Sequence, residues 1–515
     1  MSLARHIGVI GFHTALGRFL GYVRDSIIIA FLGASAIADA LFIATKIASL
    51  FRRLFTEGAF NASFIPIFGS LKEKKGTQKA VYFAEQSLVW IMLLAGIITA
   101  YVAGFTESFV GMIAAGFKGD PEKMQWTVEF TRIVFPYILL ICMTAVVGST
   151  LNAVHNFVQT AASQTVGNVS IIMLFFAFRP VAETTAHAAA WAILISAIIQ
   201  FVWLYVVALR IGIAMLPRLP RLTSPLKEFM KRLIPGIMGT GMVQINVLIS
   251  IYFGSYLKDG GVSYLQVTER INQFPLSIIG VSLGMVLIPM LTSQLQQNNL
   301  ESALETQNKA IETSMSLAVP IAVLTMIFAV PIVAALFMHG KFVKMDVITA
   351  APCLIAFISG LPAYVLLKVF SSTFFALKDT LRPSISGMIA MLINGVLCYL
   401  IVNDLIWEDI ANHTGIAIAL SLSGWINTII LGVWLYQQGY LTLTAALLHS
   451  LARIIIVTVL VAMVALYGLP WVEVLTFDHS YLIRIGAVGG TVVISVFMFL
   501  GFNTLVQTIT RIIRT

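Results

Sequence analysis

The residues with the clearest chemical potential are charged side chains inside long apolar segments. Arg18, Arg24 and Asp25 interrupt the first of these segments, and Asp39 and Lys46 lie in the second. If the segments cross a membrane, each ionised side chain costs about 2.5–3.5 kcal/mol on insertion scales. Their presence therefore indicates a water-filled cavity, internal ion pairs or a charged ligand.

Helical spacing gathers these charges on a few faces. Arg18 and Asp25 are seven residues apart, so an α-helix places them on one face. One stripe of the second segment holds a mixed set of charges: Asp39, Lys46, Arg53 and Glu57. Arg52 falls off this stripe. A later segment carries a broad polar stripe with Glu269 beside it: Ser263, Arg270, Gln273 and Ser277.

The bases in these three segments outnumber the acids by six to four. An unpaired cation in apolar surroundings needs an anion, and the guanidinium fork of arginine suits phosphate because it donates two parallel hydrogen bonds. We therefore expect an anionic headgroup as ligand. The alternative is that the charges pair with one another and only join helices, as Arg24 with Asp25 and Arg53 with Glu57 would.

The segments that must position these residues form an all-α polytopic membrane protein. Of 515 residues, 59% are hydrophobic and 11% charged, against roughly 25% charged in average soluble proteins. A span needs about 20 apolar residues, which predicts about fourteen transmembrane helices. Ten are uncharged runs: 86–106, 133–154, 160–178, 184–209, 313–338, 347–367, 383–403, 414–436, 454–472 and 485–510. The run 233–257 is also uncharged, and three further spans carry charges: 8–32, 37–68 and 262–292.

The net charge of +9 indicates topology. With the N-terminus inside, cytoplasmic segments hold about 16 Lys and Arg residues and outside segments about 7. This distribution follows the positive-inside rule and predicts that both termini are cytoplasmic. The sequence has no basic aromatic platform, so a nucleic-acid partner is not expected.

An internal repeat divides the chain. At an offset of 223 residues, Pro66 aligns with Pro289, and LNAVHNFVQ (151–159) aligns with FFALKDTLR (374–382). Two matches at one offset predict two pseudo-symmetric six-helix lobes, the usual plan of a transporter with its site at the repeat interface. The predicted domains are an N-lobe, a cytoplasmic linker, a C-lobe and two C-terminal helices: 1–211, 212–225, 226–440 and 441–515.

Metal binding and catalysis are not expected. The eight His residues are scattered without HExxH or paired spacing, and the three Cys residues lie far apart. A lipid-pyrophosphate phosphatase or glycosyltransferase would need catalytic carboxylates or a His nucleophile in a loop near one interface. The acids here are interleaved with arginines inside spans. The sequence therefore predicts a transporter without a catalytic residue, metal or cofactor.

Four stretches resemble the MurJ (MviN) family of the MOP exporter superfamily, the bacterial lipid II flippases. They are GRFLGYVRD (17–25), ADALFIATKIASLFRRLFTEGAFNASFIPIF (38–68), FPYILLI (135–141) and ERINQFPLSIIGVSLGMVLIP (269–289). The resemblance implies alternating-access transport of undecaprenyl-pyrophosphate-linked disaccharide-pentapeptide, from the cytoplasmic to the periplasmic leaflet of the bacterial inner membrane. That activity serves peptidoglycan synthesis and cell shape.

The resemblance also implies roles for particular residues. Arginines matching Arg18, Arg24, Arg52 and Arg270 bind substrate in the family, and the matches to Asp39 and Lys46 line the cavity. The two C-terminal helices imply a groove for the lipid tail. Lipid II and membrane lipids are then the expected partners, together with an association with cell-wall synthesis or division machinery.

Three points stay open. Helical periodicity favours Arg53 over Arg52 as the cavity residue, whereas the family favours Arg52, which we prefer. The energy source is either the membrane potential or an ion gradient. The alternative function is a polysaccharide-lipid or multidrug exporter of the same superfamily, although FRRLFTEGAF (51–60) argues against it.

Overall fold

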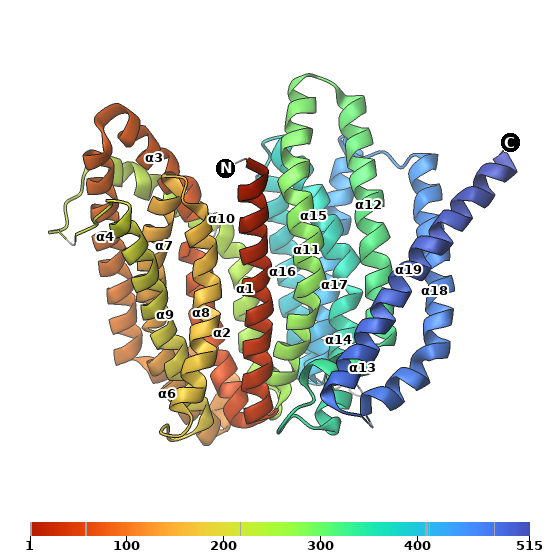
Figure 1. Cartoon of the computed structure of the whole chain (residues 1–515), viewed down its shortest axis with the longest axis horizontal. Coiled ribbons are helices and arrows are strands. Elements are labelled where there is room, and N and C mark those ends of the chain that lie inside the picture. Colours follow the sequence, from red (N-terminus) through yellow and green to blue (C-terminus); the bar gives the residue numbers. More distant parts are fainter. Residues whose placement is uncertain are drawn as a thin grey trace. The chain divides into compact units, whose positions relative to one another are not determined.

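The computed structural model describes the backbone of residues 3–514, apart from positions 57–58, 217, 407–409, 411 and 478. Side chains are not described at 3–11, 14, 51, 54–56, 59, 235–243, 281–282, 285 and 505–514 either. The described part consists of nineteen α-helices and one short 3-10 helix, with no strand (Figure 1). The predicted all-α class is confirmed.

The chain divides into two compact units, Met1–Ser263 and Tyr264–Thr515. The first contains α1 (Leu3–Leu32), α2 (Ala36–Thr56), α3 (Ala59–Lys75), α4 (Thr77–Gly104), α5 (Thr106–Ile113), η1 (Ala115–Gly119), α6 (Pro121–Val134), α7 (Tyr137–Ala153), α8 (Phe157–Phe178), α9 (Thr185–Arg210) and α10 (Ser224–Gly254). Helix α11 (Gly261–Gln296) begins in the first unit and continues into the second.

The second unit continues with eight further helices in the described part of the chain. These are α12 (Leu300–Ile327), α13 (Ala329–Phe337), α14 (Lys344–Ser359), α15 (Leu361–Ala376), α16 (Leu381–Val402), α17 (Asn412–Gln437), α18 (Ala445–Phe477) and α19 (Tyr481–Arg514). Helix α18 packs against both α12 and α19, and Figure 1 shows α18 and α19 in blue at the end of the chain.

Ten helical segments of the described residues are long and apolar enough to cross a membrane. They coincide with the ten uncharged runs that the sequence analysis identified. The other four predicted spans fall on α1, on α2 with α3, on α10 and on α11. Except for α10, these helices carry the intramembrane charges, which explains why hydropathy alone does not select them.

Several spans are broken within the apolar region. Helix α6 ends at Val134 and α7 begins at Tyr137, because the missing N–H of Pro136 interrupts the hydrogen-bond ladder. Helices α14 and α15 meet at Gly360. A span predicted from hydropathy as one helix is therefore two in both places.

The internal repeat is visible in the helix pattern of the two units. Helices α4 and α12 both have 28 residues, and their first residues, Thr77 and Leu300, are 223 positions apart. Helices α8 and α16 both have 22 residues, and α9 and α17 both have 26. Left-handed backbone recurs at the same offset, with φ of 63° at His155 and 61° at Lys378. These helix lengths and turns therefore repeat at or near the offset at which the sequence predicts a duplication.

Aromatic rings join α10 to α3 and α4. Phe229 of α10 lies edge-on to Phe60 at 5.2 Å between ring centroids, and Phe64 stacks on Phe83 at 5.0 Å. Phe229 also contacts Phe64 and Phe83 edge-on, and all four rings are fully buried. Edge-to-face pairs add about 0.5–1.5 kcal/mol each beyond area burial, so this cluster fixes the start of α10 within the first unit.

The segment between α9 and α10 is fastened to α4 by two buried polar side chains. Glu85 accepts a hydrogen bond from the N–H of Leu216 at 3.2 Å and pairs with Arg218 at 2.7 Å. Gln86 accepts from the N–H of Arg221 at 2.6 Å and donates to the carbonyl of Leu219 at 3.2 Å. The predicted linker therefore follows the surface of the first unit.

Candidate functional site

Arg24 on α1 is held by two side chains. Its Nε and Nη2 lie 2.8 and 2.6 Å from Oδ1 of Asp25, and its Nη1 donates to Oδ1 of Asn168 on α8 at 3.1 Å. Asn168 donates in turn to the carbonyl of Gly17 at 2.8 Å. The guanidinium side chain is 20% exposed, so Arg24 combines a fixed orientation with access from outside the helix bundle.

Small residues make this contact between α1 and α8 close. A Cβ atom added at Gly21 would lie 3.5 Å from Nδ2 of Asn168, and one at Gly17 would lie 3.4 Å from Gln164. Small residues allow such backbone approach between membrane helices. Arg18, on the same helix, is exposed.

Asp39 on α2 lies at the centre of a buried cluster. Its carboxylate accepts hydrogen bonds from the N–H of Gly260 at 2.9 Å, and from the N–H and Oγ of Ser263 at 2.8 and 2.7 Å. Nζ of Lys123 lies 3.1 Å from Asp39 and 3.0 Å from Asp259. Asp39 and Ser263 are 0% exposed, so in this structure they join α2, α6 and the start of α11.

The remaining charges of α2 are half-buried. Lys46, Arg52 and Arg53 all lie in this intermediate class, and Lys46 and Arg52 each have an interaction partner. Exposure does not separate Arg52 from Arg53, and the preference for Arg52 stays a prediction. Glu57 lies outside the described residues.

The polar stripe of α11 belongs mainly to the second unit. Nε2 of Gln273 donates to Oε1 of Glu269 at 2.8 Å, one helical turn away. Arg270 is half-buried and also has a partner. Because Arg270 lies in one unit and Arg18, Arg24 and Arg52 lie in the other, the substrate-binding set remains a prediction about residues of both units.

Three partners escaped the sequence analysis. They are Asn168, which contacts Arg24, and Lys123 and Asp259, which belong to the cluster around Asp39. Each lies more than 80 positions from the charge that it contacts. The one available signal was a Lys residue in the first turn of α6, where Asp120 is the N-cap residue and the helix begins at Pro121.

The fold is that of a multi-pass membrane transporter built from two related halves. A multidrug resistance transporter of the MATE family and MOP superfamily, solved in an inward-facing conformation, matches with a TM-score of 0.69 and 16% identity, over 82% of this chain and 94% of that one. A solved lipid II flippase MurJ, in an inward closed conformation, matches with a TM-score of 0.78 and 23% identity over 97% and 98%. Both similarities establish the fold alone.

The sequence identifies the family within this class. The family described as Lipid II flippase MurJ matches residues 28–485. A Rhizobium tropici protein described as a probable lipid II flippase MurJ is 31% identical over 97% of this chain and 93% of its own length. The chain belongs to the MurJ family. The predicted family is thereby confirmed, as is the prediction of a transporter instead of an enzyme.

Proposed function

We propose that this chain flips lipid II, the undecaprenyl-pyrophosphate-linked disaccharide-pentapeptide, from the cytoplasmic to the periplasmic leaflet by alternating access. The observation that carries the proposal is Arg24, an oriented and accessible guanidinium inside a span. The substrate is inferred from the membership of this chain in the MurJ family. A pyrophosphate offers the paired oxygens that a guanidinium fork binds.

The proposed mechanism uses arginines of both units. Arg24, Arg52 and Arg270 attract the pyrophosphate, which neutralises their mutual repulsion and permits the two lobes to close. Arg18 supplements this set. A ligand shifts a conformational equilibrium only through its differential affinity for the two states, so binding must be tighter in the closed state than in the inward-open one. The lipid tail stays in the membrane along α18 and α19.

The proposed location is the bacterial inner membrane, with both termini in the cytoplasm. The energy source is the membrane potential or an ion gradient, since one charge crossing 100 mV gains about 2.3 kcal/mol. No cofactor takes part in the proposed cycle. Association with cell-wall synthesis or division enzymes would supply and remove the lipid.

Depletion of the protein tests the function directly. We expect lipid II to accumulate in the cytoplasmic leaflet and cells to lyse, with restoration by the wild-type chain. Unchanged lipid II distribution together with loss of another glycolipid or of drug resistance would instead establish a polysaccharide-lipid or multidrug exporter.

Charge-conserving substitutions test pyrophosphate binding. Arg24→Lys, Arg52→Lys and Arg270→Lys should each lower flipping about tenfold, because lysine loses the second parallel hydrogen bond. Arg382→Lys is a matched control, since Arg382 forms an exposed ion pair with Asp379. Wild-type flipping in all three test variants would refute the proposed binding mode. Flipping by Arg52→Ala together with loss in Arg53→Ala would assign the site to Arg53.

A further inference from the structure

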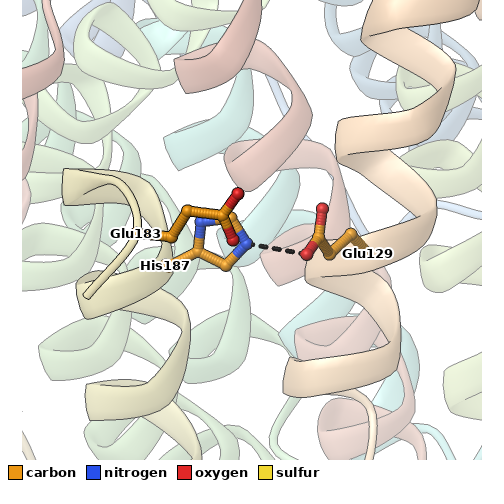
Figure 2. Close-up of side chains that lie close together, drawn as sticks. All are labelled: Glu129, Glu183 and His187. Atoms are coloured by element: carbon orange, nitrogen blue, oxygen red, sulfur yellow. Dashed lines mark ion pairs between the residues drawn. The ribbon is translucent and has the colours of Figure 1, made fainter.

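We propose that Glu129, Glu183 and His187 form a binding site for a divalent transition-metal ion, with Zn²⁺ as the best match. One ligand atom from each residue lies within 4.8 Å of the other two. Figure 2 shows the carboxylate of Glu129 facing one ring nitrogen of His187, with the side chain of Glu183 overlapping the ring in this view. Glu129 comes from α6, whereas Glu183 and His187 flank the start of α9.

The start of α9 fixes the histidine ring. Thr184 is the N-cap residue, and its Oγ1 accepts a hydrogen bond from the N–H of His187 at 3.3 Å. The same oxygen lies 2.9 Å from Nδ1 of His187. A ligand histidine usually donates its second ring N–H to an oxygen, which leaves the other nitrogen free to bind metal. Thr184 provides that oxygen, so Nε2 is the metal-binding atom.

Nε2 of His187 is buried and aimed at the carboxylate of Glu129. Oε1 of Glu129 lies 3.0 Å away, but the contact lacks hydrogen-bond geometry, and Nε2 has no other hydrogen-bond partner among the described residues. The residue is 5% exposed, with Phe130 and Trp126 edge-on to its ring at 5.1 and 5.9 Å. A buried nitrogen without a partner is costly, and a bound ion would satisfy it.

The donor set suits a transition metal. One imidazole nitrogen and two carboxylates match Zn²⁺, whereas Mg²⁺ and Ca²⁺ prefer oxygen alone. Zinc ligands at about 2.0–2.2 Å lie about 3.3 Å apart in a tetrahedron. Glu183 is exposed, so its side chain has room to change rotamer and approach the other two ligand atoms. Two carboxylates with a neutral imidazole carry two negative charges, which a divalent ion neutralises.

The site also has access to water. The three residues line a cavity of about 1340 Å³ together with Glu107, Lys118 and other residues of α5, α6 and the turn before α9. Neither Lys118 nor Arg132 forms an ion pair with these carboxylates in the described part of the chain. Water from the cavity could fill the fourth position. The ion would then join α6 to the turn before α9.

Metal binding to the full-length chain in detergent tests this proposal. After metals are removed with a chelator, Zn²⁺ is titrated against a chromogenic competitor, and Co²⁺ is followed by its visible absorption. We expect one ion per chain. Glu183→Gln, Glu129→Gln and His187→Gln should each weaken binding at least tenfold, and Thr184→Val should weaken it about 10–100-fold. Glu107→Gln is the matched control from the same cavity and should bind normally.

Thermal unfolding separates a metal site from a plain ion pair. Zn²⁺ should raise the unfolding temperature of the wild type and of Glu107→Gln but not of Glu183→Gln. Because the side chain of Glu183 is exposed, its substitution should not disturb folding. Absence of stoichiometric binding, or equal binding in all variants, would overturn the proposal. The proposal would also be overturned if His187→Gln lowered the unfolding temperature relative to the wild type by the same amount with and without Zn²⁺. Glu129 and His187 would then act only as an ion pair.

Discussion

At the scale of single residues, the charges inside the spans perform two different tasks. Arg24 stays partly exposed while Asp25 and Asn168 orient it. Asp39 is fully buried, and every contact described for it joins helices. The sequence placed both kinds of residue in one class, because helical periodicity gives the face of a helix but not what lies opposite.

Lys123→Met tests the cluster around Asp39. The substitution leaves a buried carboxylate without its counter-charge, which should lower the free energy of unfolding by about 3–5 kcal/mol. Denaturant unfolding in detergent measures this. Asp259→Asn is the control, since Asp259 is 64% exposed and its loss should cost less than about 1 kcal/mol. The double variant Lys123→Met with Asp39→Asn should lose less free energy of unfolding than Lys123→Met alone. Equal losses would contradict the ion pair between Lys123 and Asp39.

At the scale of helices, the sequence predicted most of the fold. Uncharged runs of about 20 residues identify ten spans because lipid forces such segments to be helical. Helix breaks were harder to place. The break at Pro136 follows from the missing N–H of proline. The break at Gly360 has no such signal, because it depends on neighbouring side chains: an added Cβ there would lie 2.8 Å from Oγ of Ser421.

The site could be predicted only in part, for a related reason. The arginines of α1 and α2 stand out because charge is rare in spans. The cluster of Glu129, Glu183 and His187 does not, since Glu129 lies on a different helix and the sequence contains no paired metal motif. Spacing along one helix detects ligands on that helix, whereas contacts between helices require the fold.

The short helix η1 depends on one close contact. A Cβ atom at Gly116 would lie 2.5 Å from the backbone carbonyl carbon of Ser255, and the N–H of Gly116 donates a hydrogen bond to Oγ of Ser255 at 2.9 Å. Gly116→Ala should therefore cost about 1–3 kcal/mol of stability through overpacking. Gly119→Ala has nothing within 4 Å and serves as the control. Equal thermal stability of the two variants would contradict the contact.

At the scale of the whole molecule, the two halves preserve backbone geometry where their side chains have diverged. His155 and Lys378 occupy the same position after α7 and α15, and both have left-handed backbone. The residue types differ, so the two halves share the left-handed turn and not the side chain at that position.

Substitutions at these two positions should act in parallel. His155→Val and Lys378→Val should each lower the free energy of unfolding by about 1–2 kcal/mol, because a β-branched residue is disfavoured in left-handed backbone. His155→Gly and Lys378→Gly should be tolerated. Unfolding measurements on the four variants check the symmetry; a penalty in one half only would contradict it.

The segment between α9 and α10 has a consequence for amide hydrogen exchange. Its leucines look like those of an open loop, with Leu216 and Leu219 56% and 81% exposed. The N–H groups of Leu216 and Arg221 are nevertheless bonded to Glu85 and Gln86. These two amides should exchange slowly with deuterium, and Glu85→Ala with Gln86→Ala should release them. A segment with the exposure of a flexible loop would then be fixed to α4, so that movement of α10 would be transmitted to α4.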